Sequence, residues 1–315
     1  MRKRIIVTGG AGFIGSNLCD YLLKNGHEVV CVDNFDDYYD PKIKRNNIEH
    51  ALTHPSYTLI EEDIKKTEKI LEQIHGNFDA IIHLAAKAGV RYSLKHPVGY
   101  EESNVVGTKK ILELAVKKNI KQFVFASSSS IYGNSKAPFK EDNIDLKPIS
   151  PYAQTKLLSE KTGKEYAESG KIRFISLRFF SVYGPRLRPD LVMNKIAASI
   201  YQNKELNVFG DGKASRDYTY VDDIIQGIIK SLDYTKSNYE IFNLGNGNPI
   251  KLIDIIEMFE SASSKKVNAV FTDSIQGESS ITWADNSKAI KLLNFEPETE
   301  IKNGIQNFIN WYLEK

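Results

Sequence analysis

The chain has 315 residues, and its 42 lysines and arginines nearly balance its 40 aspartates and glutamates, which gives a net charge of +2. A charge this small argues against a protein that binds nucleic acid or an anionic membrane through a basic surface. A content of only two cysteines argues against a disulfide scaffold. The sequence contains no run of about 18 apolar residues, so it predicts no membrane span. We therefore expect a cytoplasmic protein without a metal site, long enough for about two domains.

The first predicted element is a buried strand that runs into a glycine-rich turn. Residues 5–7 (Ile-Ile-Val) form an unbroken β-branched run, which is typical of a parallel strand covered on both faces. The following G-x-x-G-x-x-G pattern permits a tight turn, the approach of a pyrophosphate and close packing of helix on strand. A strand-to-helix connection without a ligand would show the same pattern. The cofactor-binding residues predicted here are Gly9, Gly12, Phe13, Ile14 and Gly15.

A second predicted strand, residues 28–32, ends in Asp33. This aspartate follows the glycines by about 20 residues, where an acid that binds the adenosine ribose belongs. Its charge would repel a 2′-phosphate, so NAD is favoured over NADP. Asp33 followed by Asn34 is also good turn chemistry, but together with the glycine turn it indicates dinucleotide binding.

Strand-like and helix-like segments then alternate, which predicts βαβ units of the α/β class. We expect a Rossmann-type doubly wound parallel sheet with a smaller α/β substrate-binding lobe. The carboxyl ends of the strands near residues 57–61 and 80–86 would form the ligand crevice. Further cofactor-binding residues predicted along this crevice are Asn34, Asp63, Ile64, Leu84, Ala85, Ala86 and Asn104.

Two other features of this region favour ordinary structural explanations. The acidic and aromatic stretch 36–40 lacks the spacing of a calcium loop, so we expect a solvated loop. His83 lies inside an apolar strand, which favours a hydrogen-bonded core histidine over a ligand or a base.

A Tyr-x-x-x-Lys pair follows the four serines 127–130. Ser150 is a candidate N-cap with Pro151 in the first helical position, so Tyr152 and Lys156 share one helix face. A tyrosine with an ordinary pKa of about 10 needs help to act as a base at neutral pH. A neighbouring ammonium and a positive nicotinamide ring both favour the phenolate.

These motifs together resemble the extended short-chain dehydrogenase/reductase family, in its nucleotide-sugar epimerase and dehydratase branch, and are most similar to UDP-glucuronate 4-epimerases. The resemblance covers nearly the whole chain. It implies that Ser128 and Tyr152 are catalytic, with Tyr152 as the base, and that Lys156 binds the nicotinamide ribose and lowers the pKa of the tyrosine. The motifs are 8–15 (TGGAGFIG), 83–86 (HLAA), the serines before Tyr132-Gly133, Tyr152-x-x-x-Lys156, and Gly210-Asp211-Gly212 with Arg216-Asp217-Tyr218.

The resemblance also implies the nucleotide site and the assembly. Arg216 would contact a phosphate, Val208 and Phe209 would lie beside the nucleobase, and Glu278 would contact the nucleotide ribose. An apolar strand and a turn would explain the last three equally well. A homodimer through the helices near 104–118 and 152–168 is implied too.

Epimerisation at C4 is the reaction that the serine run favours. Related dehydratases and decarboxylases carry an acid where this chain has Ser129 and Ser130. Without one, we expect a UDP-hexose to pass through a 4-keto intermediate and back, with NAD recycled. An NAD(P)-binding reductase and a non-catalytic dinucleotide-sensing protein are the alternatives from other classes.

The sugar is suggested by three residues, which we predict to bind substrate. Many relatives that act on neutral sugars carry Asn at the position of Ser181. The smaller serine hydroxyl would leave room for a C6 carboxylate. Arg188 could pair with that carboxylate through a guanidinium fork, although it could instead pair only with Asp190. Arg91 lies in a segment similar to the glucuronate epimerases. The prediction is UDP-glucuronate to UDP-galacturonate, with UDP-glucose or UDP-N-acetylglucosamine as the alternative.

The predicted domains follow from these assignments. Residues 1–178 and 216–241 would form the NAD-binding Rossmann domain. Residues 179–215 and 242–315 would form the nucleotide-sugar-binding lobe.

Overall fold

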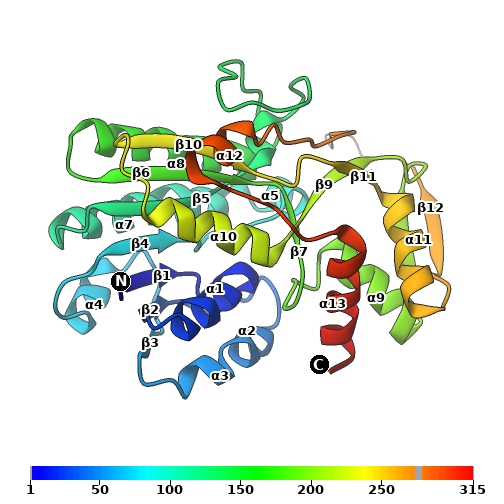
Figure 1. Cartoon of the computed structure of the whole chain (residues 1–315), viewed down its shortest axis with the longest axis horizontal. Coiled ribbons are helices and arrows are strands. Elements are labelled where there is room, and N and C mark those ends of the chain that lie inside the picture. The colour runs from blue at the N-terminus through cyan, green and yellow to red at the C-terminus, as the bar shows by residue number, and fades with distance from the viewer. Residues whose placement is uncertain (1, 274–278, 315) are drawn as a thin grey trace.

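A parallel sheet with the strand order β10-β6-β5-β4-β1-β2-β3 forms the larger part of the molecule (Figure 1). We describe it from a computed structural model, in which residues 2–273 and 279–314 are described. The order places β1 between β4 and β2, so the chain reverses its direction of travel across the sheet at β1. This confirms the predicted doubly wound α/β class. The strands are β1 Arg4–Thr8, β2 Glu28–Val32, β3 Tyr57–Ile60, β4 Ala80–His83, β5 Gln122–Ser128, β6 Arg173–Phe179 and β10 Tyr239–Leu244.

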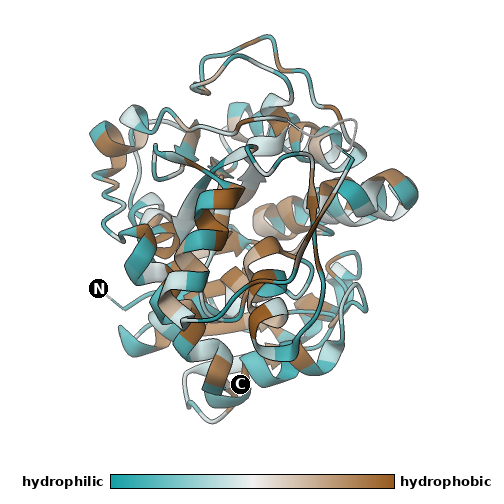
Figure 2. Ribbon diagram, turned by 90° about the vertical axis from the view of Figure 1, so that its right-hand side faces the viewer, coloured by the Kyte–Doolittle hydropathy of each residue, from teal (hydrophilic) through white to brown (hydrophobic). Residues whose placement is uncertain are grey.

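Helices cover both faces of this sheet. Alternate residues of β1 point to opposite faces, and Ile5 and Val7 join one apolar core whereas Ile6 joins a second. The first core lies under α1 (Phe13–Lys24) and α10 (Val221–Leu232), and the second lies under α7 (Gly107–Lys117). In Figure 2 apolar and polar residues alternate along the helices, as expected of helices that cover a core with one face. The continuous apolar strands of the sequence thus reflect burial on two sides.

Shorter helices occupy the connections on the ligand side of the sheet and beyond. The expected helix near 104–118 is preceded by a chain of short helical pieces and one π-helical segment, so the helical path begins well before residue 104. All the short helical elements of these connections are α2 Pro41–Asn47, α3 Glu49–Leu52, α4 Thr67–Gln73, α5 Val90–Lys95, α6 Pro97–Tyr100, the π-helix η1 Glu101–Val106 and the 3-10 helix η2 Ser129–Tyr132. The longest helix, α8 (Pro151–Glu168), packs against η1, α7 and β6.

The second part of the chain builds smaller sheets beside the first. β7 (Ser181–Tyr183), β9 (Ser215–Tyr220) and β11 (Pro249–Lys251) form one, and β8 (Leu206–Phe209) pairs in parallel with β12 (Ala269–Thr272). In Figure 1 β12, α9 and α11 lie together on the right, away from β1 to β3. The helices of this part are α9 Val192–Gln202, α11 Leu252–Ser263, α12 Ser287–Leu293 and α13 Ile301–Glu314.

One predicted domain boundary needs a correction. β10 belongs as a whole to the large sheet, where all six of its residues pair with β6, so a boundary between 241 and 242 would cut a strand. The segment 216–241 was assigned to the NAD-binding domain, but its first residues lie on β9, which belongs to the small sheet. The division into two lobes stays a prediction, and its third boundary moves to the residues after Leu244.

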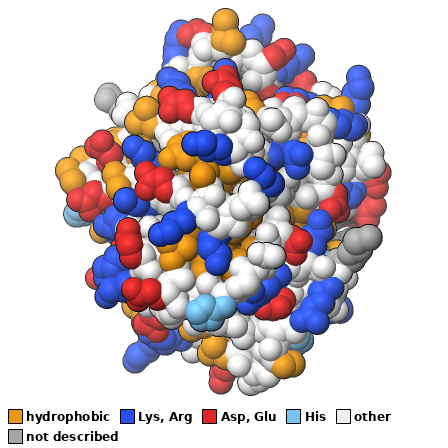
Figure 3. Space-filling view, turned by 90° about the vertical axis from the view of Figure 1, so that its left-hand side faces the viewer, with side chains coloured by type: hydrophobic (Ala, Val, Ile, Leu, Met, Phe, Trp, Pro, Cys, Tyr) orange, Lys and Arg blue, Asp and Glu red, His pale blue; other side chains and the backbone are white. Residues whose placement is uncertain are grey.

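The described surface agrees with the balanced composition. On the face shown in Figure 3, basic and acidic side chains are interspersed, and no large field of one sign covers that face. Among the described helices, none combines the length and the apolar composition needed to cross a bilayer.

Candidate active site

A cavity of about 960 Å³ follows the carboxyl ends of β1, β2, β4 and β5 and continues into the smaller lobe. Its volume lies at the upper end of the range for small-molecule sites, which fits a dinucleotide together with a second ligand. Most of the residues predicted from the sequence line it: Gly9, Gly12, Phe13, Ile14, Gly15, Asp33, Asn34, Asp63, Ile64, Leu84, Ala85, Ala86, Arg91, Ser128, Tyr152, Lys156, Ser181, Arg188, Phe209 and Arg216.

The glycine turn forms a tight cradle at one end of the cavity. Gly9 has a φ of +72°, and a Cβ there would lie 2.7 Å from the backbone nitrogen of Ala85. A Cβ on Gly15 would collide with the carbonyl of Gly9, so only glycine lets the helix start this close to the turn. Gly12 caps α1 without a side-chain hydrogen bond, so the first N–H groups of the helix can bind phosphate oxygens. These residues fit the pyrophosphate of NAD.

Asp33 lies directly after β2 and is 7% exposed. Its carboxylate accepts hydrogen bonds from the backbone N–H of Ala11 at 3.0 Å and of Phe35 at 2.9 Å. Burial raises the pKa of this carboxyl, while nearby Lys44 and the two N–H groups oppose that rise. Asp33 therefore fastens the glycine turn to the end of β2 in addition to facing the cavity, a role that the sequence did not suggest.

The stretch 36–40 is only in part the solvated loop that we expected, since Asp37 and Asp40 are exposed. Asp36 and Tyr38 are partly buried and line the cavity, and the Asp36 carboxylate accepts a hydrogen bond from Lys87 Nζ at 2.9 Å. Lys44 Nζ donates to the Asp36 carbonyl oxygen at 2.8 Å. Two lysines thus stabilise a loop whose acidic composition suggested exposure.

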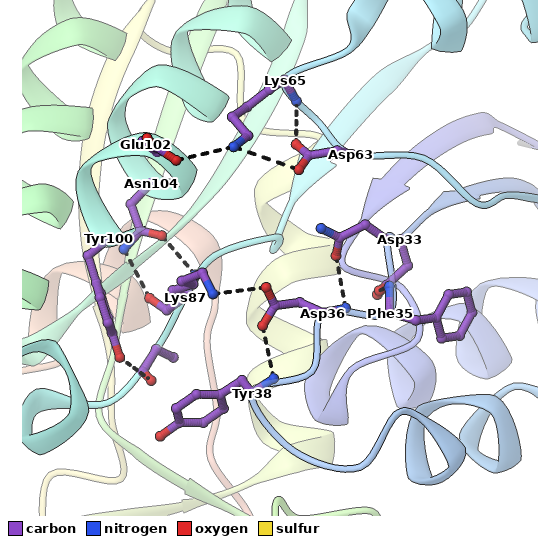
Figure 4. Close-up of polar contacts among 12 residues, drawn as sticks. Asp33, Phe35, Asp36, Tyr38, Asp63, Lys65, Lys87, Tyr100, Glu102 and Asn104 are labelled. Atoms are coloured by element: carbon purple, nitrogen blue, oxygen red, sulfur yellow. Dashed lines mark hydrogen bonds and ion pairs between the residues drawn. The ribbon is translucent and has the colours of Figure 1, made fainter. Parts of the chain in front are cut away.

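Two predicted binding residues lie away from the cavity wall, and a third cannot be placed. Asn104 is buried, and its amide holds the backbone of Lys87 through both Oδ1 and Nδ2 (Figure 4). Its Nδ2 also donates to the Thr155 hydroxyl at 3.0 Å. Val208 lies on β8 and is fully buried, because alternate residues of this strand face the core. The structure thus gives both residues a structural role, and their direct contacts with a ligand stay predictions. Glu278 lies outside the described residues.

His83 has the structural role that the sequence indicated. Its ring nitrogens are hydrogen-bonded to Thr8 at 2.6 Å and to Thr108 at 3.0 Å. Burial lowers the pKa of His83 to about 3, so the ring is neutral at physiological pH. This confirms a core histidine.

The catalytic candidates come from β5 and α8. Ser150 accepts the predicted capping bond from Ala153 N, and Pro151 occupies the first turn, so the expected start of α8 is confirmed. Ser128, the last residue of β5, accepts hydrogen bonds on its Oγ from Ser130 N at 3.2 Å and Ser130 Oγ at 2.9 Å. The sequence had drawn attention to Ser130 only because relatives carry an acid near this position, and the structure shows that Ser130 orients the Ser128 hydroxyl.

Electrostatics at Tyr152 differ from the expectation. Burial raises the pKa of Tyr152, and a hydrogen bond with Ser128 and the charge of Arg188 oppose that rise. Burial lowers the pKa of Lys156 to about 7, and its Nζ donates to the carbonyl of Ala126 at 2.7 Å. Arg188, which the sequence had suggested only as a substrate contact, is thus a cation whose charge opposes the rise in the pKa of Tyr152, and the effect of Lys156 on that pKa stays a prediction.

A buried carboxylate that the sequence reasoning missed supports these residues from behind. Glu160 lies one helical turn after Lys156, and its charge counteracts the fall in the pKa of that lysine. Its carboxylate accepts hydrogen bonds from Ser127, Ser176 and Arg178. The i, i+4 spacing from Lys156 was the available signal.

Ser181 and Arg188, the residues predicted to bind the sugar, both line the cavity. Arg188 donates from Nε and Nη2 to the two oxygens of Asp190 at 2.9 and 2.8 Å, so the pairing considered from the sequence is present. Arg91 lies over the Phe209 ring at 4.4 Å, and both line the cavity beyond this point. Arg216 donates to the Ser215 carbonyl at 2.9 Å.

A doubly wound sheet, a glycine cradle, a buried acid after β2 and a Tyr-Lys pair define an NAD-binding enzyme that carries out hydride chemistry. The chain belongs to the NAD dependent epimerase/dehydratase family, which matches residues 5–245. NAD is its cofactor, and within the family the chain falls among the NAD-dependent UDP-sugar 4-epimerases.

Individual relatives cover almost the whole chain. A UDP-glucuronate 4-epimerase of Thermodesulfobacterium geofontis is 41% identical over 98% of this chain and 96% of its own length. The crystal structure of UDP-glucuronic acid 4-epimerase from Bacillus cereus with UDP-glucuronic acid and NAD is 38% identical, with a TM-score of 0.91 over 99% of both chains. The UDP-glucose 4-epimerase of Thermotoga maritima with UDP-glucose is 28% identical, with a TM-score of 0.90 over 99% of both chains.

Proposed function

We propose that the protein epimerises UDP-glucuronate at C4 to give UDP-galacturonate. The observation that carries this proposal is Arg188, a cationic side chain on the cavity wall close enough to Tyr152 to affect its pKa. Asp190 takes one edge of the guanidinium, which has five N–H donors, so donors remain for a C6 carboxylate. Ser181 adds a small hydroxyl on the same wall.

The chain's own groups would handle one proton and fix the sugar. Tyr152, as phenolate, removes the proton of the C4 hydroxyl, and Ser128 donates a hydrogen bond to that oxygen. Bound NAD would supply the acceptor for the C4 hydride and the donor for its return, and Tyr152 would then give the proton back to O4. Turning the 4-keto sugar about its pyrophosphate tether exposes the opposite face, so the configuration inverts without net redox change.

Other outcomes of a 4-keto intermediate need an acid at positions where this chain has serines. Elimination or assisted decarboxylation would need a carboxylic acid close to Ser128. The positions are Ser129 and Ser130, and Ser130 is hydrogen-bonded to Ser128. Epimerisation is the reaction that these side chains support.

Relatives support the acidic sugar without excluding the neutral one. The Bacillus cereus structure binds UDP-glucuronic acid at 38% identity, whereas the Thermotoga maritima structure binds UDP-glucose at 28% identity. UDP-glucose is therefore the second candidate, and Arg188 is the feature that favours glucuronate over it.

The test is to incubate the NAD-loaded protein with UDP-glucuronate, UDP-glucose and UDP-N-acetylglucosamine separately and to follow the C4 configuration by NMR. We expect inversion with UDP-glucuronate to be the fastest. The Tyr152→Phe variant should lose turnover and keep NAD binding, because only the proton acceptor is removed. Wild-type activity confined to neutral sugars would overturn the assignment of the sugar, and an active Tyr152→Phe would overturn the mechanism.

We also propose a homodimer through the outer faces of α5 to α8. Leu94, Val98, Val106 and Leu158 are 55%, 69%, 44% and 46% exposed on α5, α6, η1 and α8, elements that contact one another. Apolar side chains gathered in this way are typical of a protein interface. Sedimentation of wild type and Val98→Glu tests it, since the variant should sediment as a smaller species.

A further inference from the structure

Arg188 is restrained by a residue from the other half of the chain. Its guanidinium carbon lies 5.4 Å from the centre of the Tyr38 ring, and the Tyr38 hydroxyl donates to Asp190 Oδ2 at 3.2 Å. Burial raises the pKa of Tyr38 to about 12, so this hydroxyl remains a donor at neutral pH. Burial alone would raise the pKa of Asp190, but the Arg188 fork and the Tyr38 hydroxyl lower it, so the carboxylate stays charged.

Tyr38 is itself fixed to the NAD-binding side of the cavity (Figure 4). Its backbone N–H donates to Asp36 Oδ1 at 3.0 Å, and Lys87 Nζ donates to Asp36 Oδ2 at 2.9 Å. Lys87 is in turn held by Asn104, which accepts from Lys87 N at 2.8 Å and donates to Lys87 O at 2.9 Å. The edge of the Tyr92 ring packs on Tyr38, with centroids 4.8 Å apart. The loop after β2 therefore has a fixed position over the cavity.

We propose that Tyr38 and Asp190 are positioning residues that hold the Arg188 guanidinium toward Tyr152, so that the loop following the ribose-binding strand contributes to sugar selectivity. The selectivity part rests on the proposed function, because it assumes that Arg188 meets the substituent at C6. The positioning part depends only on the contacts among the three side chains.

A long arginine side chain needs such restraint. It loses considerable rotamer freedom when it is held in one place, and each fixed contact made before substrate binds reduces that loss at the moment of binding. Asp190 fixes the Nε edge, and Tyr38 fixes Asp190 and covers one face of the guanidinium. The remaining N–H groups then keep one orientation.

The experiment compares Tyr38→Phe, Asp190→Asn and the double variant as NAD-loaded proteins, with kcat and KM for UDP-glucuronate and UDP-glucose over a range of pH. Tyr38→Phe removes only the hydroxyl, and we expect about a 3- to 10-fold loss of kcat/KM for UDP-glucuronate relative to UDP-glucose. The acidic limb of the kcat profile should move to higher pH, because a displaced Arg188 no longer lowers the pKa of Tyr152. The double variant should be no worse than Asp190→Asn, because both changes release the same fork.

Two further variants separate the possible failures. Tyr92→Phe keeps the ring against Tyr38 and should leave the selectivity unchanged. If Arg188→Gln lowers activity on both sugars in proportion, the proposed role of Arg188 at C6 fails. The acidic limb of the kcat profile of Tyr38→Phe then tests by itself whether Tyr38 positions Arg188. If the acidic limb of the kcat profile stays at the wild-type pH and the losses in the double variant are additive, the proposal that Tyr38 and Asp190 position Arg188 is wrong. Melting temperatures of all variants identify any loss that comes from folding.

Discussion

Arg178 and Arg188 bind carboxylates in the same way, through Nε and Nη2, but their surroundings differ. The side chains of Arg178 and Glu160 are each 2% exposed and lie behind the ends of β5 and β6. Those of Arg188 and Asp190 are 17% and 34% exposed on the cavity wall. A fully buried pair cannot change partner without leaving a charge stranded, whereas a pair at a cavity wall can share its donors with a ligand. The same fork thus serves as scaffold in one place and as a binding group in the other.

Breaking the buried fork should have the largest effect. Glu160→Ala leaves Arg178 without its carboxylate and removes the acceptor for Ser127 and Ser176, so the free energy of unfolding should fall by about 3–5 kcal/mol. Urea unfolding of the NAD-free protein measures this. Glu168→Ala on the same helix, which breaks an exposed pair with Lys164, is the matched control and should cost less than about 1 kcal/mol. Equal losses for the two variants would contradict the distinction.

Breaking the fork at the cavity should act on selectivity rather than on folding. Arg188→Ala should cost about 2–5 kcal/mol in kcat/KM for UDP-glucuronate, and much less for UDP-glucose. Steady-state kinetics with both sugars checks this. Arg186→Ala is the control from the same loop, since Arg186 pairs with Asp20 on α1, and this variant should keep the wild-type preference for UDP-glucuronate.

Asp33 extends the comparison to a carboxylate whose observed hydrogen-bond donors are backbone N–H groups. Asp33→Ala should weaken NAD binding by about 1.5–3 kcal/mol, because the ribose loses its acceptor. The preference for NAD over NADP should become smaller, because the charge that repels the 2′-phosphate is lost. Calorimetric titration with both dinucleotides measures the change. Equal affinity of the wild type for NADP would refute the ribose assignment.

Lys156 is a buried cation without a carboxylate fork, and its effect on stability over one pH unit should be the smallest of these effects. Its pKa is about 7 in the folded chain and about 10.4 in the unfolded chain. Below pH 7 both states carry the proton, and folding buries the charge. Between these two pKa values only the unfolded chain keeps the proton, so the free energy of unfolding should rise with pH by up to about 1.4 kcal/mol per unit. Lys156→Met should remove this slope in urea unfolding of the NAD-free protein.

Local motifs explain which parts could be predicted from the sequence. The glycine turn, Asp33 after β2 and the Tyr152-Lys156 spacing each lie within one strand, turn or helix, and the spacing alone brings their groups together. The alternating segments likewise predicted the doubly wound sheet, because covering helices impose continuous apolar strands.

Contacts between distant segments explain what the sequence did not show. Asp36 meets Lys87 across 51 residues, and Tyr38 meets Asp190 across 152 residues, so their acidic and aromatic composition alone suggested a solvated loop. Asn104 has the expected place near the cofactor region, but tertiary packing directs its amide to the backbone of Lys87. Val208 and Phe209 were predicted together, because the sequence alone does not say which of two neighbours on a strand faces the cavity, and the structure places Phe209 there.

The late arrival of β10 has a consequence for synthesis on the ribosome. β6 ends at Phe179, and the chain then builds β7, α9, β8, β9 and α10 before Tyr239 begins the strand that pairs with β6. Until that strand emerges, the outer side of β6 is an unpaired parallel edge, which is a surface prone to aggregation. A chain interrupted between residues 180 and 238 would therefore expose this edge permanently, and a holdase that covers β6 should raise the yield of folded protein.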